Sequence, residues 1–400
     1  MVFIPYGKQD IDEADVRTVL ETLRSDFLTQ GPAIERFEKA FATEVGAPLA
    51  VACANGTAAL HLCSLAGGVR PGDRAVVTPI SFVASANCIR YAGGTVEFAD
   101  IEPHSLTLSP ARVAEKLEQA TAAGNPIRVV VTVDLCGHPC DLVAFARLKK
   151  QYGFLWIHDA CHALGASACD EQGRRRRVGE WPEIDYVAYS FHPVKHITTG
   201  EGGMVTTHDQ AAAERLRQYR THGITRQASE FVNRAEAYDE NGTLNPWYYE
   251  MQALGYNFRL TDLQAALGES QLRRLPGFLL RRREIANRYR ESLSGLRHLN
   301  MVPVRPDVEH AYHLFVVRID YHALGKSRAR VMTELRSRDI GTQVHYIPIP
   351  MMPAYGSQLE RTDLPVAWQY YREALSIPCY AGMTDTDVDR VIQALKEVVT

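Results

Sequence analysis

A single lysine, Lys195, lies in a stretch of hydroxyl, histidine and glycine residues that reads SFHPVKHITTGEGG from Ser190 to Gly203. The apolar run IDYVAYSF before it and the run GGMVTT after it are typical of strands, so we expect Lys195 on a constrained loop between them. A lysine in such a place can act as an amine nucleophile if suitable partners surround it. A solvated surface lysine explains the same window equally well. Its chemistry therefore depends on what the rest of the chain brings to it.

Hydroxyl groups and a helix start follow two of the predicted strands. Asn55, Gly56 and Thr57 lie where the apolar run LAVACA turns into a helix. The free amide groups and the positive dipole end of a helix start suit a phosphate, to which the Thr57 hydroxyl could add a bond. Ser190, at another strand end, offers a second hydroxyl to the same anion. A plain capped helix explains the first site equally well.

An acid and an aromatic residue also follow predicted strands. The apolar run FLWIHDA reaches Asp159, where a carboxylate either caps a helix or pairs with a cation in a crevice. Phe82 opens a helix just after a strand; it is typical of a core residue, although at the lip of a crevice it would suit stacking on a planar ring. His158 and His162 are four residues apart, but the strand-then-turn context points them differently and disfavours a metal pair.

Taken together, these groups match the demands of one cofactor. Pyridoxal phosphate needs a lysine for an imine, an acid for its pyridine nitrogen, an aromatic face and an anion site for its phosphate. Lys195, Asp159 and Phe82 with the Thr57 helix start meet those four demands. The chain has no GxGxxG after its first strand and no GxxxxGK[ST], so dinucleotide and P-loop sites have little support.

The elements that must position these residues follow from the hydrophobic pattern. After two predicted helices at 10–25 and 34–45, apolar strands alternate with helices as far as residue 207. This alternation predicts an α/β fold with a mostly parallel sheet covered by helices on both faces. Ligands of such sheets bind at the carboxyl ends of the strands, where Asp159 and Ser190 are expected.

The pattern changes in the C-terminal part. The segment 221–255 is too polar to be core, and a helical region follows at 261–293 with Arg281 to Arg283 on its solvent face. A mixture of strands and helices then includes a predicted strand at 342–347. We expect a large domain at residues 1–265, made of the N-terminal helices and the cofactor-binding sheet, and a smaller α+β domain at 266–400.

Composition limits the possible functions. A formal net charge of −3 argues against a general nucleic-acid-binding protein, and the one basic run, Arg174 to Arg177, is expected to be the solvated tip of a hairpin or loop. We see no signal-peptide pattern and no apolar run long enough to cross a bilayer, so a cytoplasmic protein is expected. The eight scattered cysteines predict reduced thiols. Cys136 and Cys140 lack the second pair that a zinc site would need, so no metal is expected.

Six segments form a more specific pattern: NGTAAL, TPISFVASAN, IHDACHALG, SFHPVKHITTGEGGM, LGYNFRLTDLQAALG and HYIPIP. In order and spacing they resemble the sugar aminotransferases of the DegT/DnrJ/EryC1/StrS family, and the resemblance runs from about Ile4 to the C-terminus. It implies the fold-type I architecture of pyridoxal phosphate enzymes. His158 departs from the family pattern because an acidic residue is common there, which could alter the electrostatics around Asp159.

The resemblance also implies a role for each matching residue. Lys195 would form the imine, Asp159 would pair with the pyridine nitrogen and Phe82 would stack on the ring. The other implied contacts are His162 near the phenolic oxygen of the ring, Gly56, Thr57, Ala58 and Ser190 at the phosphate, Asn257 of the neighbouring subunit at the same phosphate, and Tyr6, His192, His313, His345 and Tyr346 near a sugar nucleotide.

Within that family, the segments IPYGKQDI, SDFLTQGP, THGITR and PWYYEMQALGYN look most like the UDP-4-amino-4,6-dideoxy-N-acetyl-β-L-altrosamine transaminases of pseudaminic acid synthesis. The implied reaction moves an amino group, with glutamate as the expected donor, to the C4 keto group of a UDP-linked 4-keto-6-deoxy-N-acetyl hexose. The implied assembly is a homodimer whose active site is completed across the subunit interface.

Other functions share much of this pattern. Aminotransferases of the perosamine, 4-amino-arabinose and 3-amino sugar pathways act on other nucleotide-linked keto sugars with the same core. A related class that deoxygenates sugars with pyridoxamine phosphate carries histidine in place of the lysine, so Lys195 argues against it. A non-catalytic regulator of the same fold would be expected to lose Lys195 or Asp159, or to carry an added nucleic-acid domain.

Overall fold

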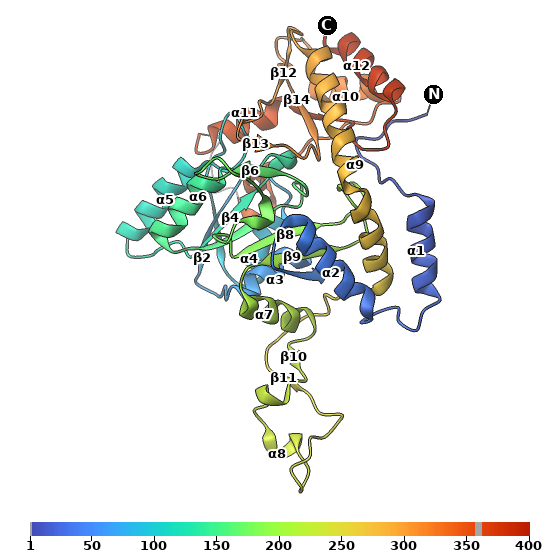
Figure 1. Ribbon diagram of the computed structural model, residues 1–400. Coiled ribbons are helices and arrows are strands. Elements are labelled where there is room, and N and C mark those ends of the chain that lie inside the picture. Colours follow the sequence, from blue (N-terminus) through green and yellow to red (C-terminus); the bar gives the residue numbers. More distant parts are fainter. Residues whose placement is uncertain (1, 357–361) are drawn as a thin grey trace.

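The computed structural model describes residues 2–356 and 362–400 of the chain (Figure 1). At its centre lies a seven-stranded sheet in which every neighbouring pair of strands is parallel except the two pairs that involve β9. The predicted α/β class with a mostly parallel sheet is therefore confirmed. In spatial order the strands are β1 (Leu49–Cys53), β9 (Gly203–Thr207), β8 (Tyr186–Ser190), β5 (Leu155–Asp159), β4 (Val129–Val133), β2 (Arg74–Val77) and β3 (Thr95–Phe98).

Alternate residues of the central strands enter two separate cores, because side chains of a strand point to opposite faces. Val130 and Trp156 pack on one face with α2 (Pro32–Val45), α5 (Pro110–Ala122) and α6 (Leu142–Tyr152). Their neighbours Val131 and Ile157 pack on the other face, with helices that fill the second core. Those helices are α3 (Gly56–Ala66), α4 (Ala84–Tyr91) and α7 (Gln210–Arg220). Burial on both faces explains why these strands are continuously apolar in sequence.

The N-terminal helices α1 (Glu13–Leu23) and α2 pack along α9 (Asp262–Leu293). Asp262, the first residue of α9, is buried and joins this helix to the start of α2. Its Oδ1 accepts a hydrogen bond from the Gly31 amide at 2.7 Å, and its Oδ2 accepts one from the Ala33 amide at 3.0 Å. These amides belong to the start of α2, where helical partners are missing, so Asp262 satisfies them from another helix.

The C-terminal part forms a second, antiparallel sheet of β12 (Leu299–Met301), β14 (Phe315–Ile319) and β15 (Ala374–Ile377). Its core includes residues of α10 (Arg328–Arg336) and α12 (Asp385–Val399), while α11 (Pro365–Glu373) precedes β15. The strand predicted at 342–347 is wrong: Gln343 makes only an isolated bridge to Ser376. The following residues, Val344 to Ile347, line a cavity instead of extending a ladder.

The helix that begins near residue 261 corrects a further expectation. Arg281 and Arg283 are partly exposed, but Arg282 between them is only 2 % exposed. Its Nη1 donates to the backbone oxygens of Tyr312, His313 and Cys379. The prediction that all three arginines face solvent is therefore wrong for Arg282, because the helix is covered by the C-terminal part on that side.

The basic run lies in a small sheet made of β13 (Val308–Glu309), β6 (Ser167–Cys169) and β7 (Arg175–Arg177). The predicted position at a hairpin tip is wrong, because three of the arginines form β7 itself and the turn lies at 170–173. Asp170 pairs with Arg174 and Arg176 across that turn, at 3.0 and 2.9 Å. The run is thus a local ion-paired strand.

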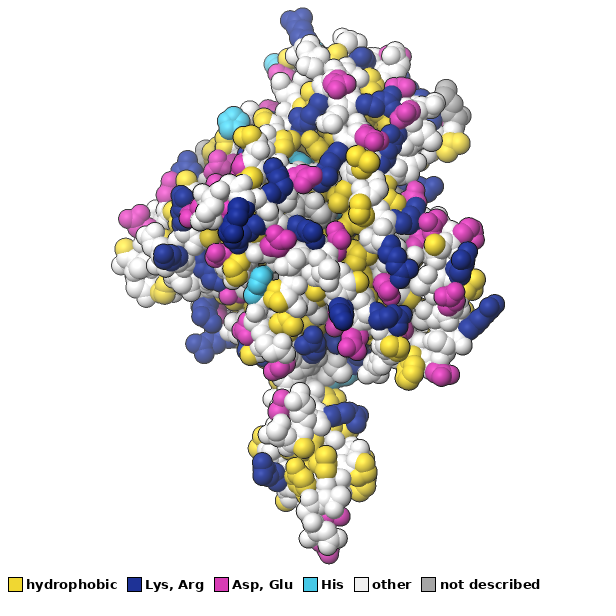
Figure 2. All heavy atoms as spheres, viewed as in Figure 1, with side chains coloured by type: hydrophobic (Ala, Val, Ile, Leu, Met, Phe, Trp, Pro, Cys, Tyr) yellow, Lys and Arg dark blue, Asp and Glu magenta, His cyan; other side chains and the backbone are white. Residues whose placement is uncertain are grey.

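An arm formed by residues 221–257 projects from the body (Figure 1). Its regular elements are short: β10 (Ile224–Thr225), β11 (Glu250–Met251) and α8 (Arg234–Ala237). Phe231 packs edge-on against Tyr248 within the arm, but Trp247 is 70 % exposed. Hydrophobic side chains are visible on the arm in the space-filling view (Figure 2). No helix in the described ranges combines the length and the apolar character that a membrane span requires.

The contact between Asp262 and the start of α2 gives a stability prediction. Asp262→Ala leaves two amides without acceptors, at a cost of about 1–3 kcal/mol for each one that stays buried. We therefore expect a lower midpoint in urea-induced unfolding followed by circular dichroism. Asp262→Asn, which keeps one acceptor oxygen, should fall between the wild type and Asp262→Ala. Equal midpoints for all three proteins would contradict this account.

Candidate active site

A cavity of about 630 Å³ opens at the carboxyl ends of β1, β2, β5 and β8. Residues that follow those strands line it, as expected where parallel strands end at one edge of a sheet. Of the site residues proposed from the sequence, all but Ala58 and Asn257 lie in its wall. They are Tyr6, Gly56, Thr57, Phe82, Asp159, His162, Ser190, His192, Lys195, His313, His345 and Tyr346.

Lys195 lies on the loop between β8 and β9, and its amide donates to the His192 backbone oxygen at 2.8 Å. This turn directs the chain back toward the cavity. Burial lowers the pKa of the Lys195 amine, while the charges of Cys161 and Asp159 partly oppose that shift. A larger share of the amine is therefore unprotonated near neutral pH than for a solvated lysine, which is what a nucleophile or base requires.

Asp159 ends β5 and is 5 % exposed. Its Oδ2 accepts a hydrogen bond from the Ser85 hydroxyl at 2.6 Å, and its Oδ1 accepts one from the Cys161 amide at 3.0 Å. Both bonds fix the orientation of the carboxylate. Sequence reasoning missed Ser85, although it lies in the segment TPISFVASAN one helical turn after Phe82.

The start of α3 forms a narrow cradle beside Ser190. A Cβ atom on Gly56 would lie 2.8 Å from the Ser190 Cβ, so only glycine allows this close approach. The Asn55 side chain caps the helix by accepting from the Ala58 amide at 2.8 Å. That amide is thus already used, whereas Gly56 and Thr57 line the cavity with first-turn amides that have no partner inside the helix.

Three buried histidines line the cavity: His162, His313 and His345. His162 Nδ1 accepts from the Cys136 amide at 3.3 Å, so its proton lies on Nε2, which is 3.1 Å from the Tyr346 hydroxyl. Burial lowers the pKa of His345 to about 4, and burial lowers the pKa values of His162 and His313 well below the usual range. His313 Nδ1 is buried without a partner among the described residues, which leaves it available to a ligand.

The rim of the cavity carries aromatic side chains. Phe82 is 56 % exposed, and its ring centroid lies 6.3 Å from that of Tyr346. Tyr6 packs against His345 with ring centroids 5.2 Å apart, and His192 lies on the exposed side of the Lys195 loop. An exposed phenylalanine at the mouth of a polar cavity offers a face on which a planar ring can stack.

Asn257 lies outside the cavity. It forms an isolated bridge with Thr221 at the base of the arm, where the Phe258 amide also donates to the Arg220 backbone oxygen. Asn257 is exposed at the surface and is not part of the cavity wall of its own chain.

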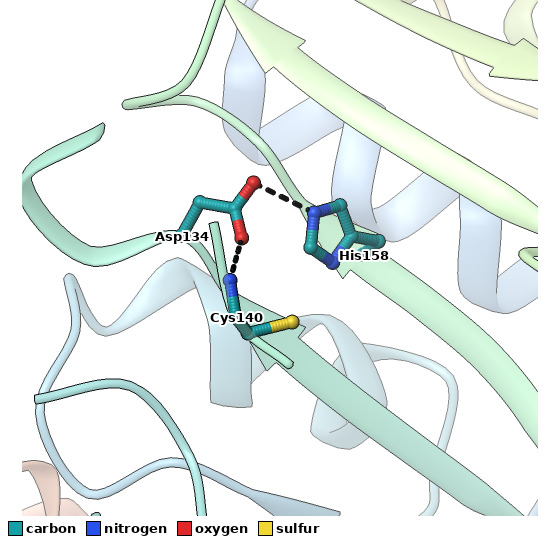
Figure 3. Close-up of side chains that lie close together, drawn as sticks. All are labelled: Asp134, Cys140 and His158. Atoms are coloured by element: carbon teal, nitrogen blue, oxygen red, sulfur yellow. Dashed lines mark hydrogen bonds and ion pairs between the residues drawn. The ribbon is translucent and has the colours of Figure 1, made fainter. Parts of the chain in front are cut away.

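Asp134, Cys140 and His158 form a buried cluster (Figure 3). His158 and Asp159 are neighbours on β5, so their side chains point to opposite faces of the sheet. His158 Nε2 is 2.8 Å from one Asp134 oxygen, and the Cys140 amide donates to the other at 2.8 Å. His158 Nδ1 bonds the Thr132 hydroxyl at 2.7 Å. Every polar group of the Asp134–His158 pair thus has a protein partner. Within the described ranges, His158 and Cys140 belong to this cluster, whereas His162 and Cys136 do not.

Comparisons with known proteins agree with this geometry. The model of the DegT/DnrJ/EryC1/StrS aminotransferase family matches residues 9–396. The chain is 38 % identical to the spore coat polysaccharide biosynthesis protein SpsC of Bacillus subtilis, over 99 % of this chain and 97 % of that protein.

Solved structures give the same result. An aminotransferase, TlmJ, from Streptoalloteichus hindustanus superposes with a TM-score of 0.86 at 31 % identity, covering 99 % of this chain and 98 % of that one. PseC from Helicobacter pylori, an aminotransferase involved in the biosynthesis of pseudoaminic acid, superposes with a TM-score of 0.86 at 26 % identity, covering 99 % of each chain. The fold is that of the fold-type I aminotransferases. The chain therefore belongs to the DegT/DnrJ/EryC1/StrS aminotransferase family and is a sugar aminotransferase.

Proposed function

We propose that this protein uses pyridoxal phosphate to transfer an amino group from glutamate to the C4 keto group of a UDP-linked 4-keto-6-deoxy-N-acetyl hexose. The observation that carries the proposal is the shared cavity of Lys195, Asp159 and the α3 start. A lysine with a lowered pKa, a fixed carboxylate and a glycine-lined helix start at one edge of a sheet supply the three polar contacts that this cofactor needs.

The cavity wall fits the cofactor part by part. The phosphate would be held by Gly56, Thr57 and Ser190, where the close approach of Gly56 to Ser190 leaves amide and hydroxyl groups facing one space. The ring would lie between Phe82 and the Asp159 side of the cavity. The sugar and its reacting C4 position would face His313, whose buried Nδ1 has no partner among the described residues.

The residues of the chain then divide the work of the reaction. Bound pyridoxal phosphate supplies a ring that withdraws electrons from the carbon next to the reacting amine. The carboxylate of Asp159, oriented by Ser85 and the Cys161 amide, would keep the pyridine nitrogen protonated. The Lys195 Nζ, the one lysine amine in the described cavity wall, would move a proton from the donor α-carbon to the cofactor carbon that carries the amine. In the second half of the reaction it would move a proton from that cofactor carbon to C4 of the acceptor sugar.

The sugar is the finer part of the proposal. Support for a 4-keto-6-deoxy-N-acetyl hexose comes from the likeness to PseC over nearly the whole chain and from the segments PWYYEMQALGYN and HYIPIP. The altrosamine transaminase of pseudaminic acid synthesis is the proposed activity. The precursors of perosamine, 4-amino-arabinose and 3-amino sugars are the competing acceptors, and they would meet the same wall of Tyr6, His313 and Tyr346.

We also propose a homodimer in which each arm region completes the neighbouring site. Asn257 lies outside its own cavity, and the arm beside it exposes Trp247, Leu254 and Val232. Exposed apolar side chains on a projection are typical of an interface. The large domain at 1–265 and the small domain at 266–400 would meet along α9, which begins at the end of the large one.

Lys195→Ala should abolish the visible absorbance that pyridoxal phosphate develops with the purified protein and should lower turnover at least about 100-fold, since the variant lacks both imine amine and base. Lys39→Ala, which removes an exposed lysine of α2, is the matched control and should behave as wild type. Normal transamination by Lys195→Ala would refute the assignment of this lysine.

The acceptor can be identified with a panel of keto sugar nucleotides. Incubation with glutamate and each sugar, followed by measurement of 2-oxoglutarate release, should give the highest kcat/KM with the UDP-linked 4-keto-6-deoxy-N-acetyl hexose. A pocket shaped for one hexose should favour it over isomers by about 10-fold or more. A clear preference for a 3-keto or GDP-linked sugar would replace the proposed substrate while leaving the aminotransferase class intact.

The shared site predicts complementation between inactive variants. Asn257→Asp places a carboxylate where the phosphate is expected, so that variant and Lys195→Ala should each be impaired as pure dimers. After unfolding and refolding together, half of the dimers should be hybrids, each with one intact site, and about one quarter of wild-type activity should return. Mixtures with no recovered activity, although hybrids form, would contradict a site shared between subunits.

A further inference from the structure

A second, smaller cavity lies behind Lys195. It is lined by residues of the N-terminal segment, the Lys195 loop and α9, and it has room for about one water molecule. Among the described residues, Lys195 alone lines both this cavity and the active-site cavity. The other side of the small cavity reaches Lys8 and Gln9, which are exposed at the surface. Lys195 therefore lies between the active-site cavity on one side and the small cavity on the other.

Arg282 forms one wall of this small cavity and is an unusual buried cation. Its neighbours Arg281 and Arg283 pair with Asp385 and Glu309, but none of the ion pairs in the described part of the chain involves Arg282. Its Nη1 is used by three backbone oxygens, at 2.7 to 3.1 Å. Its Nε–H is buried and has no hydrogen-bond partner within the described ranges. The Arg282 Nε–H is thus a charged hydrogen-bond donor without a partner among the described residues.

His196 forms another wall of the small cavity and has a hydrogen-bond acceptor without a partner among the described residues. Its Nε2 lies 3.0 Å from the Ala311 backbone oxygen, which can only accept, so Nε2 carries the proton. Burial lowers the pKa of His196 well below the usual range, and the nearby Arg282 charge lowers it further, so Nδ1 is an unprotonated acceptor. That nitrogen is buried and has no partner among the residues described.

Three other polar side chains of the small cavity already have partners: Gln271, Thr198 and Asp10. Gln271 Nε2 donates to Asp15 and to the Asp10 backbone oxygen. Thr198 donates to the Phe191 backbone oxygen, and the Asp10 carboxylate pairs with Arg274. The fully buried atoms of this cavity without a partner among the described residues are therefore the donor Arg282 Nε and the acceptor His196 Nδ1. A chloride ion could satisfy only the donor, whereas a water molecule satisfies both, because it accepts and donates.

We propose that one ordered water occupies this cavity, accepts from Arg282 Nε, donates to His196 Nδ1, and donates its second hydrogen to the Lys195 amine. Arg282 and His196 are positioning residues in this arrangement, since they act on Lys195 through the water. A water polarised by a cation is a better donor, so it favours the Lys195 amine in its neutral, reactive form. The inference rests on the proposed function, in which Lys195 is the reacting amine.

The charge state of Lys195 depends on every group around it, and the water is one contribution among several. Asp159 and Cys161 favour the charged amine, and burial opposes them. The titratable or charged groups that face Lys195 across the two cavities are Asp159, Cys161, His162, His192, His196, Glu201, His313, His345, Tyr6, Tyr346, Arg282, Lys8 and Asp10.

Crystallography of the full-length enzyme with its cofactor tests the site directly. At a resolution that shows ordered water, one molecule should lie within about 3.2 Å of both Arg282 Nε and His196 Nδ1. Density for such a water supports the proposal. A dry cavity, or a halide located by anomalous scattering after growth in bromide, would overturn it. Neither result bears on the Lys195→Ala outcome, so the proposed function is tested separately.

Two substitutions of His196 separate its two nitrogens. His196→Gln can keep a donor near the Ala311 oxygen but loses the acceptor at the Nδ1 position, whereas His196→Asn can keep an acceptor there. The matched control is His208→Gln, because His208 Nε2 also lies 3.0 Å from a backbone oxygen, that of Gly179, away from both cavities.

The measurement is acylation of Lys195 in the cofactor-free full-length protein across a pH series, quantified by peptide mass spectrometry. At pH 8, His196→Gln should react about threefold more slowly than wild type, which corresponds to a pKa rise of about half a unit. His196→Asn and His208→Gln should follow the wild-type pH profile. An unchanged profile for a folded His196→Gln protein, or an equal rise in His196→Asn, would overturn the proposal.

Discussion

A carboxylate buried at the end of a parallel strand is the constraint on which the site depends. A polar group with little exposure is tolerated only when hydrogen bonds from the protein replace those it would make with water. Asp159 meets this requirement with the Ser85 hydroxyl from α4 and the Cys161 amide from its own turn. Ser85 belongs to α4, which follows β2, whereas Cys161 follows β5, so the carboxylate connects α4 to the end of β5. The geometry of the site therefore depends on how this helix packs on the sheet.

Buried imidazoles contribute to the electrostatics around Lys195. Burial lowers the pKa values of His162, His313 and His345 in the active-site cavity and of His196 in the small cavity. Protonated imidazoles would repel the ammonium form of the lysine and compete for anions. In the neutral form they provide one donor and one acceptor each. The α3 start therefore offers an anionic ligand the positive end of a helix dipole.

Much of this could be predicted from local sequence. Short apolar runs that alternate with helical patterns predict strands buried on both faces. The parallel sheet and the residues at its carboxyl edge can therefore be predicted from the sequence. Features that depend on packing between distant segments were less accessible. Ser85 is one hydroxyl among many on a helix, and only the fold brings it to Asp159. Arg282 looks like its two neighbours in sequence, and only the C-terminal part makes it buried. Residues 342–347 have a strand pattern, yet residues 343–347 line the cavity.

The placement of β9 has a consequence for how the protein is made. In the sheet β1 has a single neighbour, β9, which lies about 150 residues later in the chain and immediately after the Lys195 loop. During synthesis, which proceeds from the N-terminus, β1 has no strand to pair with until β9 has left the ribosome. Such a long-range pairing closes a large loop and is intrinsically slow. The same event that fixes β1, and with it the α3 start, also closes the loop that carries Lys195. The two halves of the site therefore form together, so a nascent chain does not hold a finished anion cradle before it holds the lysine.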